Sequence, residues 1–298
     1  KAIKKHLNDS WDHGSFAMEA KVKEEQPSVT EADLSTIQDE LGSFSTDAGG
    51  GERWKNLKNG VEKLNGTVVM PGEQISVHDV TAPYDEEHGY VQAGSYENGQ
   101  VVDTYGGGIC QVSSTLYNAL LRAELKITKR FSHSMAVSYV DLAADAALAG
   151  DYKDLVFEND TDAPVYVQGV YNPGGSITFN IYGHDTRKQS HSVKYESELV
   201  STTPIKTETK KDPTKPVGFT ETTPGHTGYV AKLWKITYED GKEVNREVLH
   251  TSTYAMSPTK KIVGTKKASD DKKKDKPSKS DDDDEKTTQG KKKKNQEE

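Results

Sequence analysis

Apolar residues recur at three- and four-residue steps in three stretches of the chain, a spacing that places them on one face of an α-helix. The first stretch follows a capping-box pair, Thr30 and Asp33, and stops at Gly42, which predicts a short helix. The second ends at Asn65-Gly66, and the third predicts the most apolar helix, over about residues 110–124. The apolar positions are Leu34, Ile37 and Leu41, then Trp54, Leu57, Val61 and Leu64, then Val112, Leu116, Leu120 and Ala123.

Short runs of β-branched and aromatic residues, separated by turn sequences, predict strands elsewhere. Asn98-Gly99 predicts a hairpin turn, and residues 172–175 predict another turn. From residue 193 to 264 the pattern has no helical period, and two long runs flank Asp240-Gly241, which predicts an extended two-stranded ribbon. The other predicted strands cover residues 68–70, 127–131, 155–158, 165–171 and 177–182. The fold class is therefore α+β: a mixed helix and strand domain, followed by an elongated all-β module and a polar tail.

The low apolar content of the chain has a local origin. Only 32% of the 298 residues are hydrophobic, against about 45–50% apolar residues in ordinary globular chains. Residues 265–298 contain 12 Lys and 10 Asp or Glu, with Ala268 as the one apolar side chain, so we expect a disordered tail. Residues 1–264 carry 27 basic and 37 acidic residues, a net charge of −10, which argues against nucleic acid as a partner.

The single cysteine, Cys110, excludes an intramolecular disulfide framework and a zinc site built mainly from thiolates. The histidines show no two-His helical spacing beside a carboxylate, so we expect no metal and no other cofactor. No run of 18 apolar residues predicts a membrane span, and no signal segment opens the chain. We therefore expect membrane attachment only through an anchor upstream of Lys1.

Cys110 lies where a glycine-rich turn, Gly106-Gly107-Gly108, enters the most apolar helix. The helix dipole and the unpaired N–H groups of a first helical turn favour thiolate over thiol. The N–H groups of Cys110 and Gln111 are candidates for an oxyanion hole. Three consecutive glycines carry a conformational penalty, which predicts that something approaches this backbone closely. A structural alternative stays open, because a free cysteine is most often a small buried apolar residue.

A thiolate nucleophile needs a group that accepts and donates protons, and His133 follows Cys110 by 23 residues. A helix followed by a returning strand brings such an imidazole to the helix N-terminus, where either Asp145 or Asp154 is a candidate for orienting it. Arg130 is a candidate for holding a substrate carboxylate or for lowering the pKa of the thiol. The alternatives are a hydrogen-bonded surface histidine and a solvated arginine.

These residues resemble the VanW family of bacterial cell-envelope proteins over about residues 34–183. The most specific part is the run Gly106–Ala119, and the resemblance also includes Asn65-Gly66, Pro71-Gly72-Glu73, Gly89-Tyr90, His133-Ser134 and Asp145-Ala146. Residues 193–264, with glycines 218, 225, 228, 241 and 264, resemble the five-glycine domain that is often appended to envelope enzymes and adhesins.

The resemblance divides the chain into four parts. They are the end of a peptidoglycan-binding-like domain (1–29), a VanW-like catalytic domain (30–190), a five-glycine-like β domain (191–264) and the Lys/Asp-rich tail (265–298). The sequence departs from the VanW pattern at residues 75–78, which lack the usual Phe and Asn, and at residues 142–144, which lack the usual Pro and Gly. Both departures affect expected substrate loops and leave Cys110 and His133 in place.

The resemblance implies a peptidoglycan L,D-transpeptidase of the Gram-positive cell wall, because clostridial VanW members have that activity. Cys110 would attack the carbonyl between the third and fourth residues of a stem tetrapeptide and form a thioester acyl-enzyme. A diaminopimelate amine of a neighbouring stem would then form a 3-3 cross-link, with His133 moving the protons. The supporting or substrate-binding residues that it implies are Gly108, Gln111, Arg130, Ser132 and Asp145.

The expected partners are peptidoglycan stem peptides and wall glycan. We expect a monomer in the cell wall or at the outer face of the cytoplasmic membrane. Two alternatives stay open. A non-catalytic peptidoglycan-binding or adhesion protein is consistent with the polar, elongated C-terminal region. A cysteine peptidase, carboxypeptidase or amidase would share the acyl-enzyme and resolve it with water instead of an amine.

Overall fold

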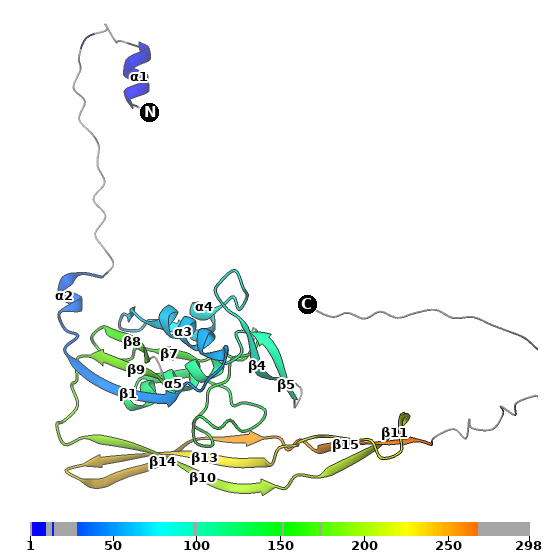
Figure 1. Ribbon diagram of the computed structural model, residues 1–298. Coiled ribbons are helices and arrows are strands. Elements are labelled where there is room, and N and C mark those ends of the chain that lie inside the picture. Colours follow the sequence, from blue (N-terminus) through cyan, green and yellow to red (C-terminus); the bar gives the residue numbers. More distant parts are fainter. Residues whose placement is uncertain are drawn as a thin grey trace, which may run out of the picture. The chain divides into compact units, whose positions relative to one another are not determined.

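The computed structural model describes residues 2–9, 14, 29–97, 100–150, 152–172 and 175–267 (Figure 1). The chain forms two compact units, Lys1–Thr207 with Pro224–Thr259, and Glu208–Thr223 with Lys260–Glu298. Within the predicted segment 1–29, the structure describes helix α1 (Ala2–Asp9) and two single residues. Most of the predicted tail, residues 268–298, lies outside the described residues.

A four-stranded antiparallel sheet in the order β1-β9-β8-β2 forms the centre of the first unit. Helix α5 (Ile109–Arg122) packs against β1 and β9, helix α3 (Arg53–Leu64) packs against β8, and the two helices contact each other. The strands are β1 (Asp39–Asp47), β2 (Thr67–Val69), β8 (Val165–Asn172) and β9 (Ser176–Gly183). The α+β class predicted from the sequence is confirmed (Figure 1).

Smaller elements surround this layer. Strands β3 (Gln74–Ser76), β7 (Val156–Glu158) and β6 (Lys126–Lys129) form a second antiparallel sheet, and α4 (Val77–Thr81) follows β3. Strands β4 (Gln92–Glu97) and β5 (Gln100–Tyr105) pair as a hairpin, as predicted, while its turn residues 98 and 99 lie outside the described residues.

The core lies between the central sheet and the two helices. Alternate residues of β9, namely Ile177, Phe179 and Ile181, are fully buried, as expected for a strand with one face against the helices. The predicted helix faces are also buried at Leu57, Val61, Leu64, Val112, Leu116, Leu120 and Ala123. Each large apolar side chain of this kind contributes about 1.5–3 kcal/mol on burial, so the packing of α5 fixes the position of its N-terminus.

The first predicted helix is correct at its beginning and wrong at its end. Helix α2 (Glu31–Leu34) begins with the predicted capping box, in which Asp33 Oδ2 accepts from the Thr30 N–H at 2.9 Å. It stops after one turn, and Leu41 and Gly42 belong to β1. A Cβ at Gly42 would lie 2.3 Å from the Ala123 nitrogen. Gly42 is therefore required where β1 crosses the end of α5, and it does not end a helix.

The predicted ribbon is present and has a third strand. β13 (Gly228–Glu239) and β14 (Lys242–Tyr254) are joined by Asp240 and Gly241, which adopt φ of 51° and 72°, as a two-residue hairpin turn requires. β10 (Ser192–Thr203) pairs with the other edge of β13. Ala231 and Leu233 of β13 belong to the same buried cluster as the helix residues, so this sheet packs into the core of the first unit.

The second unit contains a three-stranded sheet in the order β11-β15-β12. Its strands are β11 (Thr207–Pro216), β12 (Thr220–Thr223) and β15 (Thr259–Lys266), and nearly all their side chains are exposed or half-buried. Among the helices that the structure describes, none has the length and hydropathy of a membrane-spanning segment.

Candidate active site

Cys110 occupies the first turn of α5, directly after a turn in which each of three glycines has a local structural reason. Gly106 and Gly108 adopt positive φ of 75° and 108°, which side chains rarely tolerate. A Cβ at Gly107 would lie 2.0 Å from the carbonyl oxygen of Ala93 in β4. The close approach that the glycines predicted is therefore made by the chain's own backbone, and it gives no information about a ligand.

The Cys110 sulfur contacts the backbone of a neighbouring loop. As a thiol, Sγ donates to the Leu148 carbonyl at 3.3 Å, and as thiol or thiolate it accepts the Leu148 N–H at 3.4 Å. Burial opposes ionisation of this thiol, but its hydrogen bond to His133 and the charge of that imidazole outweigh burial, so the pKa of Cys110 lies below its ordinary value. The arrangement favours a thiolate paired with an imidazolium.

His133 lies in the loop between β6 and β7, where its imidazole pairs with Asp145 and interacts electrostatically with Cys110. Its Nδ1 lies 2.6 Å from Asp145 Oδ2, and its backbone N–H donates to the same oxygen at 2.7 Å. Since a carboxylate only accepts, Nδ1 carries a hydrogen, and Nε2 is the ring nitrogen that can exchange a proton. Burial alone would lower the pKa of His133, but the hydrogen bonds to Asp145 and Cys110 raise it to about 9.

Asp145 is fully buried and accepts four hydrogen bonds, two at each carboxylate oxygen. Oδ1 accepts from Arg130 Nη2 at 2.8 Å and from the Tyr254 hydroxyl at 2.5 Å. Burial would raise the pKa of Asp145, but the bond to His133 and the positive charges of His133 and Arg130 lower it to about 2. The carboxylate is therefore ionised at neutral pH and holds the imidazole in one orientation.

The structure distinguishes between the two aspartates that the sequence left open. Asp154 Oδ2 accepts from the Ser76 hydroxyl at 2.7 Å, and its Oδ1 accepts from the His78 N–H at 3.0 Å. It therefore anchors α4 to the loop before β7, while Asp145 contacts His133. The sequence could not choose between them because both follow His133 without a distinguishing pattern.

The Arg130 guanidinium forms hydrogen bonds with protein groups around Asp145. Its Nε donates to the Asp145 carbonyl at 2.6 Å, its Nη1 to Ser252 at 2.9 Å and its Nη2 also to Ala143 at 3.2 Å. With these partners and a side chain only 10% exposed, its guanidinium is directed to protein groups. The predicted contact of Arg130 with a substrate carboxylate has no geometric support. Ser132 offers its carbonyl to Lys153 Nζ at 3.1 Å.

Gln111 connects α5 to β1 and to α3 through side-chain hydrogen bonds. Its buried amide donates to Thr46 Oγ1 at 2.8 Å and accepts from Arg53 Nη1 at 2.6 Å. Its backbone N–H donates to the Gly108 carbonyl at 2.8 Å, so that N–H does not serve the predicted oxyanion hole. Within the described part of the chain, the Cys110 N–H has no hydrogen-bond partner, and it is the first-turn donor that stays available for an anion.

Tyr139 belongs to the site and was missed from the sequence. Its hydroxyl lies 3.3 Å from His133 Nε2, and the two rings meet edge to face with centroids 6.3 Å apart. Burial and the charge of Cys110 raise the pKa of Tyr139 well above its ordinary value, so the phenol stays neutral. Tyr139 follows His133 by six residues in an irregular loop, where no periodicity marks it.

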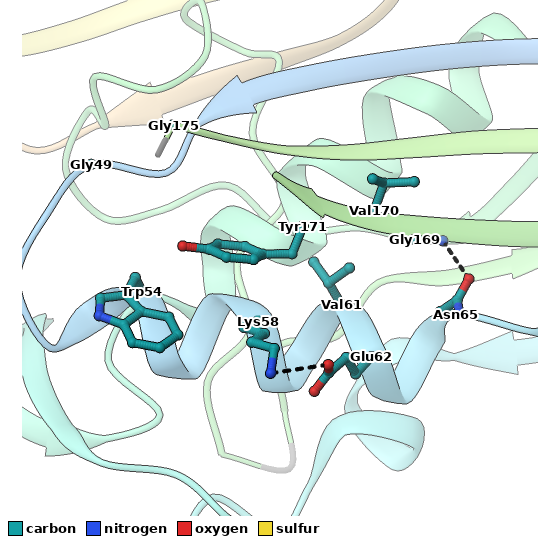
Figure 2. Close-up of a pocket in the computed structure, with 10 residues that line it drawn as sticks. All are labelled: Gly49, Trp54, Lys58, Val61, Glu62, Asn65, Gly169, Val170, Tyr171 and Gly175. Carbon is teal, nitrogen blue, oxygen red and sulfur yellow. Dashed lines mark hydrogen bonds and ion pairs between the residues drawn. The ribbon is translucent and has the colours of Figure 1, made fainter. Parts of the chain in front are cut away.

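In the described part of the chain, no group of three or more His, Cys, Asp or Glu side chains is arranged to hold a metal ion. A separate groove of about 790 Å³ lies between α3 and the β8–β9 end of the sheet (Figure 2). The rings of Trp54 and Tyr171 lie 6.0 Å apart in it with planes 26° from parallel. Lys58 and Glu62 form an ion pair at its edge, 3.3 Å between Nζ and Oε1 (Figure 2).

Comparisons with known proteins find two domains along the chain, a VanW-like domain followed by a G5 domain. Residues 52–182 match the family described as "VanW like protein", and residues 194–266 match the G5 domain. Among solved structures, the chain is similar to the G5 domain of an IgA1 protease, with 26% identity, a TM-score of 0.21 and coverage of 27% of this chain and 96% of that one.

Two curated proteins are similar in sequence. The chain is 34% identical over 156 residues to the uncharacterized protein YoaR of Bacillus subtilis (strain 168), which covers 52% of this chain and 50% of that protein. It is 31% identical over 112 residues to the vancomycin B-type resistance protein VanW of Enterococcus faecalis (strain ATCC 700802 / V583), covering 36% of this chain and 41% of that protein. The chain thus spans about half the length, or less, of these relatives.

Proposed function

The chain carries a VanW-like domain followed by a G5 domain, and from that premise we propose that it is a cell-wall L,D-transpeptidase with a cysteine nucleophile. The two domains and the relatives support a cell-wall-associated, extracytoplasmic protein. The observation that carries the proposed activity is the connected set of Cys110, His133 and Asp145 at the N-terminus of α5. A half-buried thiol that served only packing would not need an imidazole and a carboxylate beside it.

In the proposed acylation, the Cys110 thiolate attacks the carbonyl carbon between the third and fourth residues of a stem tetrapeptide. A C–S bond forms, and the Cys110 N–H stabilises the oxyanion. The C–N bond then breaks, and protonated His133 gives its Nε2 proton to the departing D-alanine amine. The product is a thioester on Cys110.

In the proposed second step, the side-chain amine of a diaminopimelate residue on another stem attacks the thioester carbonyl. His133 accepts a proton from this amine as the C–N bond forms, and the C–S bond breaks to return the thiolate. Asp145 keeps its charge throughout and stabilises the imidazolium whenever it forms. Atoms balance as one cross-link formed and one D-alanine released.

The proposal is tested by incubating the full chain with purified stem tetrapeptides that carry a free diaminopimelate amine. We expect 3-3 linked dimers and an equal amount of free D-alanine, measured by liquid chromatography and mass spectrometry. Tripeptide and D-alanine without dimers would replace the transpeptidase with a carboxypeptidase. Absence of all of these products, while a control transpeptidase reacts, would overturn the acyl-transfer function.

A second candidate function, binding of wall glycan, is favoured by the groove between α3 and β8. Trp54 was predicted on the buried face of α3, but it is 37% exposed and pairs with Tyr171 in the groove (Figure 2). Aromatic rings offer an apolar face for the C–H groups of a sugar, and the Lys58–Glu62 pair offers hydrogen-bonding groups for its hydroxyls.

Replacing Trp54 with alanine is expected to weaken binding to insoluble peptidoglycan by about fivefold or more, since exposed tryptophans at binding sites commonly contribute more than about 1 kcal/mol. Co-sedimentation with purified walls measures the dissociation constant. Tyr152→Ala is the matched control, because Tyr152 is 66% exposed and lies outside the groove. Equal binding by the Trp54 variant and the wild type would remove the glycan from this groove.

A further inference from the structure

Strand β14 directs three alternate side chains at the loop that carries Asp145. His250, Ser252 and Tyr254 lie at every second position and therefore on one face of the strand. Ser252 and Tyr254 are 1% and 3% exposed, while the intervening residues of this stretch, Thr251 and Thr253, are exposed. At this end of β14, one face is thus buried against the proposed catalytic loop and the other faces solvent, whereas residues 242–249 are exposed on both faces.

Tyr254 makes the most direct contact. Its hydroxyl donates to Asp145 Oδ1 at 2.5 Å and accepts the Ala143 N–H at 2.7 Å. Burial and the charge of Asp145 raise the pKa of Tyr254, so the phenol keeps its proton and stays a donor. With Oδ1 occupied by Tyr254 and Arg130, Oδ2 is directed to His133.

Ser252 and His250 hold the groups around that carboxylate. The Ser252 hydroxyl accepts from Arg130 Nη1 at 2.9 Å, which orients the guanidinium toward Asp145. His250 Nε2 lies 2.7 Å from the Ala143 carbonyl, and since a carbonyl only accepts, Nε2 carries the hydrogen. Burial, together with the charge of Arg130, lowers the pKa of His250, in keeping with a neutral ring.

We propose that strand β14 is a positioning element of the Cys110–His133–Asp145 set, with Tyr254 and Ser252 as its positioning residues. This inference rests on the proposed function, which it deepens. Both residues lie within the G5-matched region, 194–266, whereas the set itself lies within the VanW-matched region, 52–182. The reactivity of the VanW-like domain then depends on a strand of the domain that follows it, and the G5 region is more than an appended binding module.

The test reads the ionisation of Cys110 without any substrate. Cys110 is the one cysteine of the chain, so the rate of alkylation by iodoacetamide reports on its thiolate alone. The rate is measured from pH 5 to 10 in the full-length wild type and in the Tyr254→Phe and Ser252→Ala variants. Other titratable or charged groups near Cys110, His133 and Asp145 also influence the pH profile and are unchanged in both variants, apart from the substituted Tyr254. They are Arg130, Tyr139, Tyr254, His250, Tyr84, Tyr117 and Arg53.

We expect the Tyr254→Phe change to raise the apparent pKa of Cys110 and to slow alkylation at pH 7 by about three- to tenfold, since one pKa unit corresponds to a factor of ten. Without the hydroxyl, the Ala143 N–H and Asp145 Oδ1 each lose a direct hydrogen bond to β14, so His133 is held less often in the orientation that stabilises the thiolate. Ser252→Ala should shift the profile in the same direction by a smaller factor, because Arg130 keeps its bonds to Asp145.

Tyr229→Phe is the matched control, because Tyr229 pairs with Tyr254 across the sheet and its hydroxyl is not among the donors to Asp145. It should leave the profile unchanged. A Tyr254→Phe protein with a lower melting temperature but a wild-type alkylation profile would assign Tyr254 to the fold alone and overturn the inference. Because alkylation needs no stem peptide, failure of the transpeptidase assay would not affect this result.

Discussion

Replacing Cys110 with alanine is expected to lower the rate of acyl transfer to the uncatalysed background, a loss on the order of 10⁴-fold or more. The physical reason is that no other side chain at the N-terminus of α5 is placed to attack. Ser114, one turn along, donates to the Cys110 carbonyl at 2.8 Å and accepts from the Ala146 N–H at 2.9 Å. Its hydroxyl is therefore engaged by the backbone.

The loss should not come from unfolding. The Cys110 sulfur interacts with His133 and with the Leu148 backbone, and His133 keeps its pairing with Asp145 in the alanine variant, so this variant should lose about 1–3 kcal/mol of unfolding free energy. Dimer formation and D-alanine release are measured beside the urea midpoint of the same preparation. Cys110→Ser serves as the control for shape, because it keeps a hydrogen-bonding group without a readily ionised thiol. Activity retained by the alanine variant would remove Cys110 from the mechanism.

Changing Asp145 to asparagine should have the second largest effect. An amide has one accepting oxygen, whereas Asp145 accepts at two, so the NH₂ group must face either the donors of Arg130 and Tyr254 or the two N–H groups of His133. Arg130 also loses the charge that compensates it. We expect the acylation rate to fall by about 10²–10⁴-fold and the unfolding free energy to fall by about 3–5 kcal/mol.

The matched control is Asp154→Asn. Asp154 is also buried, at 7% exposed, and accepts two hydrogen bonds, but it contacts Ser76 and His78. Its change should reduce stability and leave the alkylation rate of Cys110 at pH 7 within about twofold of the wild type. If the two variants slowed alkylation equally, the orienting role of Asp145 would be contradicted, because both would then act only through the fold.

Acid pH offers a second readout on the Asp145 variant. The pKa of Asp145 is lowered to about 2, so its contribution to stability is present above its ordinary pKa near 4 and is lost as pH falls toward 2. The wild type should therefore lose stability over this interval more steeply than Asp145→Asn, which has no carboxylate to protonate. Urea midpoints at pH 5, 4 and 3 measure the difference.

The parts of the fold that the sequence predicted are those set by local periodicity. Helices α3 and α5 follow from their 3.6-residue spacing, and the Asp240-Gly241 turn from its need for positive φ. Leu41 and Gly42 were misassigned because Gly42 is selected by the backbone of α5, more than 75 residues further along the chain. No local pattern reports a contact of that range.

The same limit applies to the candidate site. Cys110 and His133 stood out because their chemistry is rare or specific and because the glycine turn marks a helix N-terminus. Tyr254 and Ser252 did not, since they lie 109 and 122 residues from their partners Asp145 and Arg130. A strand that alternates polar residues looks the same in sequence whether one face meets solvent or a buried carboxylate.

Acylation of Cys110 by a peptidoglycan stem would change the mass of the intact protein, and mass spectrometry of the whole chain measures that change. The wild-type chain is mixed with a stem tetrapeptide whose side-chain amine is acetylated, so that no acceptor amine is present, and the protein is examined within seconds to minutes. We expect a species heavier by the tripeptide acyl group, which fragmentation should locate on Cys110. Hydroxylamine should remove it, as it removes a thioester, and Cys110→Ala should not form it. D-alanine released without any such species, or an adduct on a residue other than Cys110, would contradict acylation of Cys110.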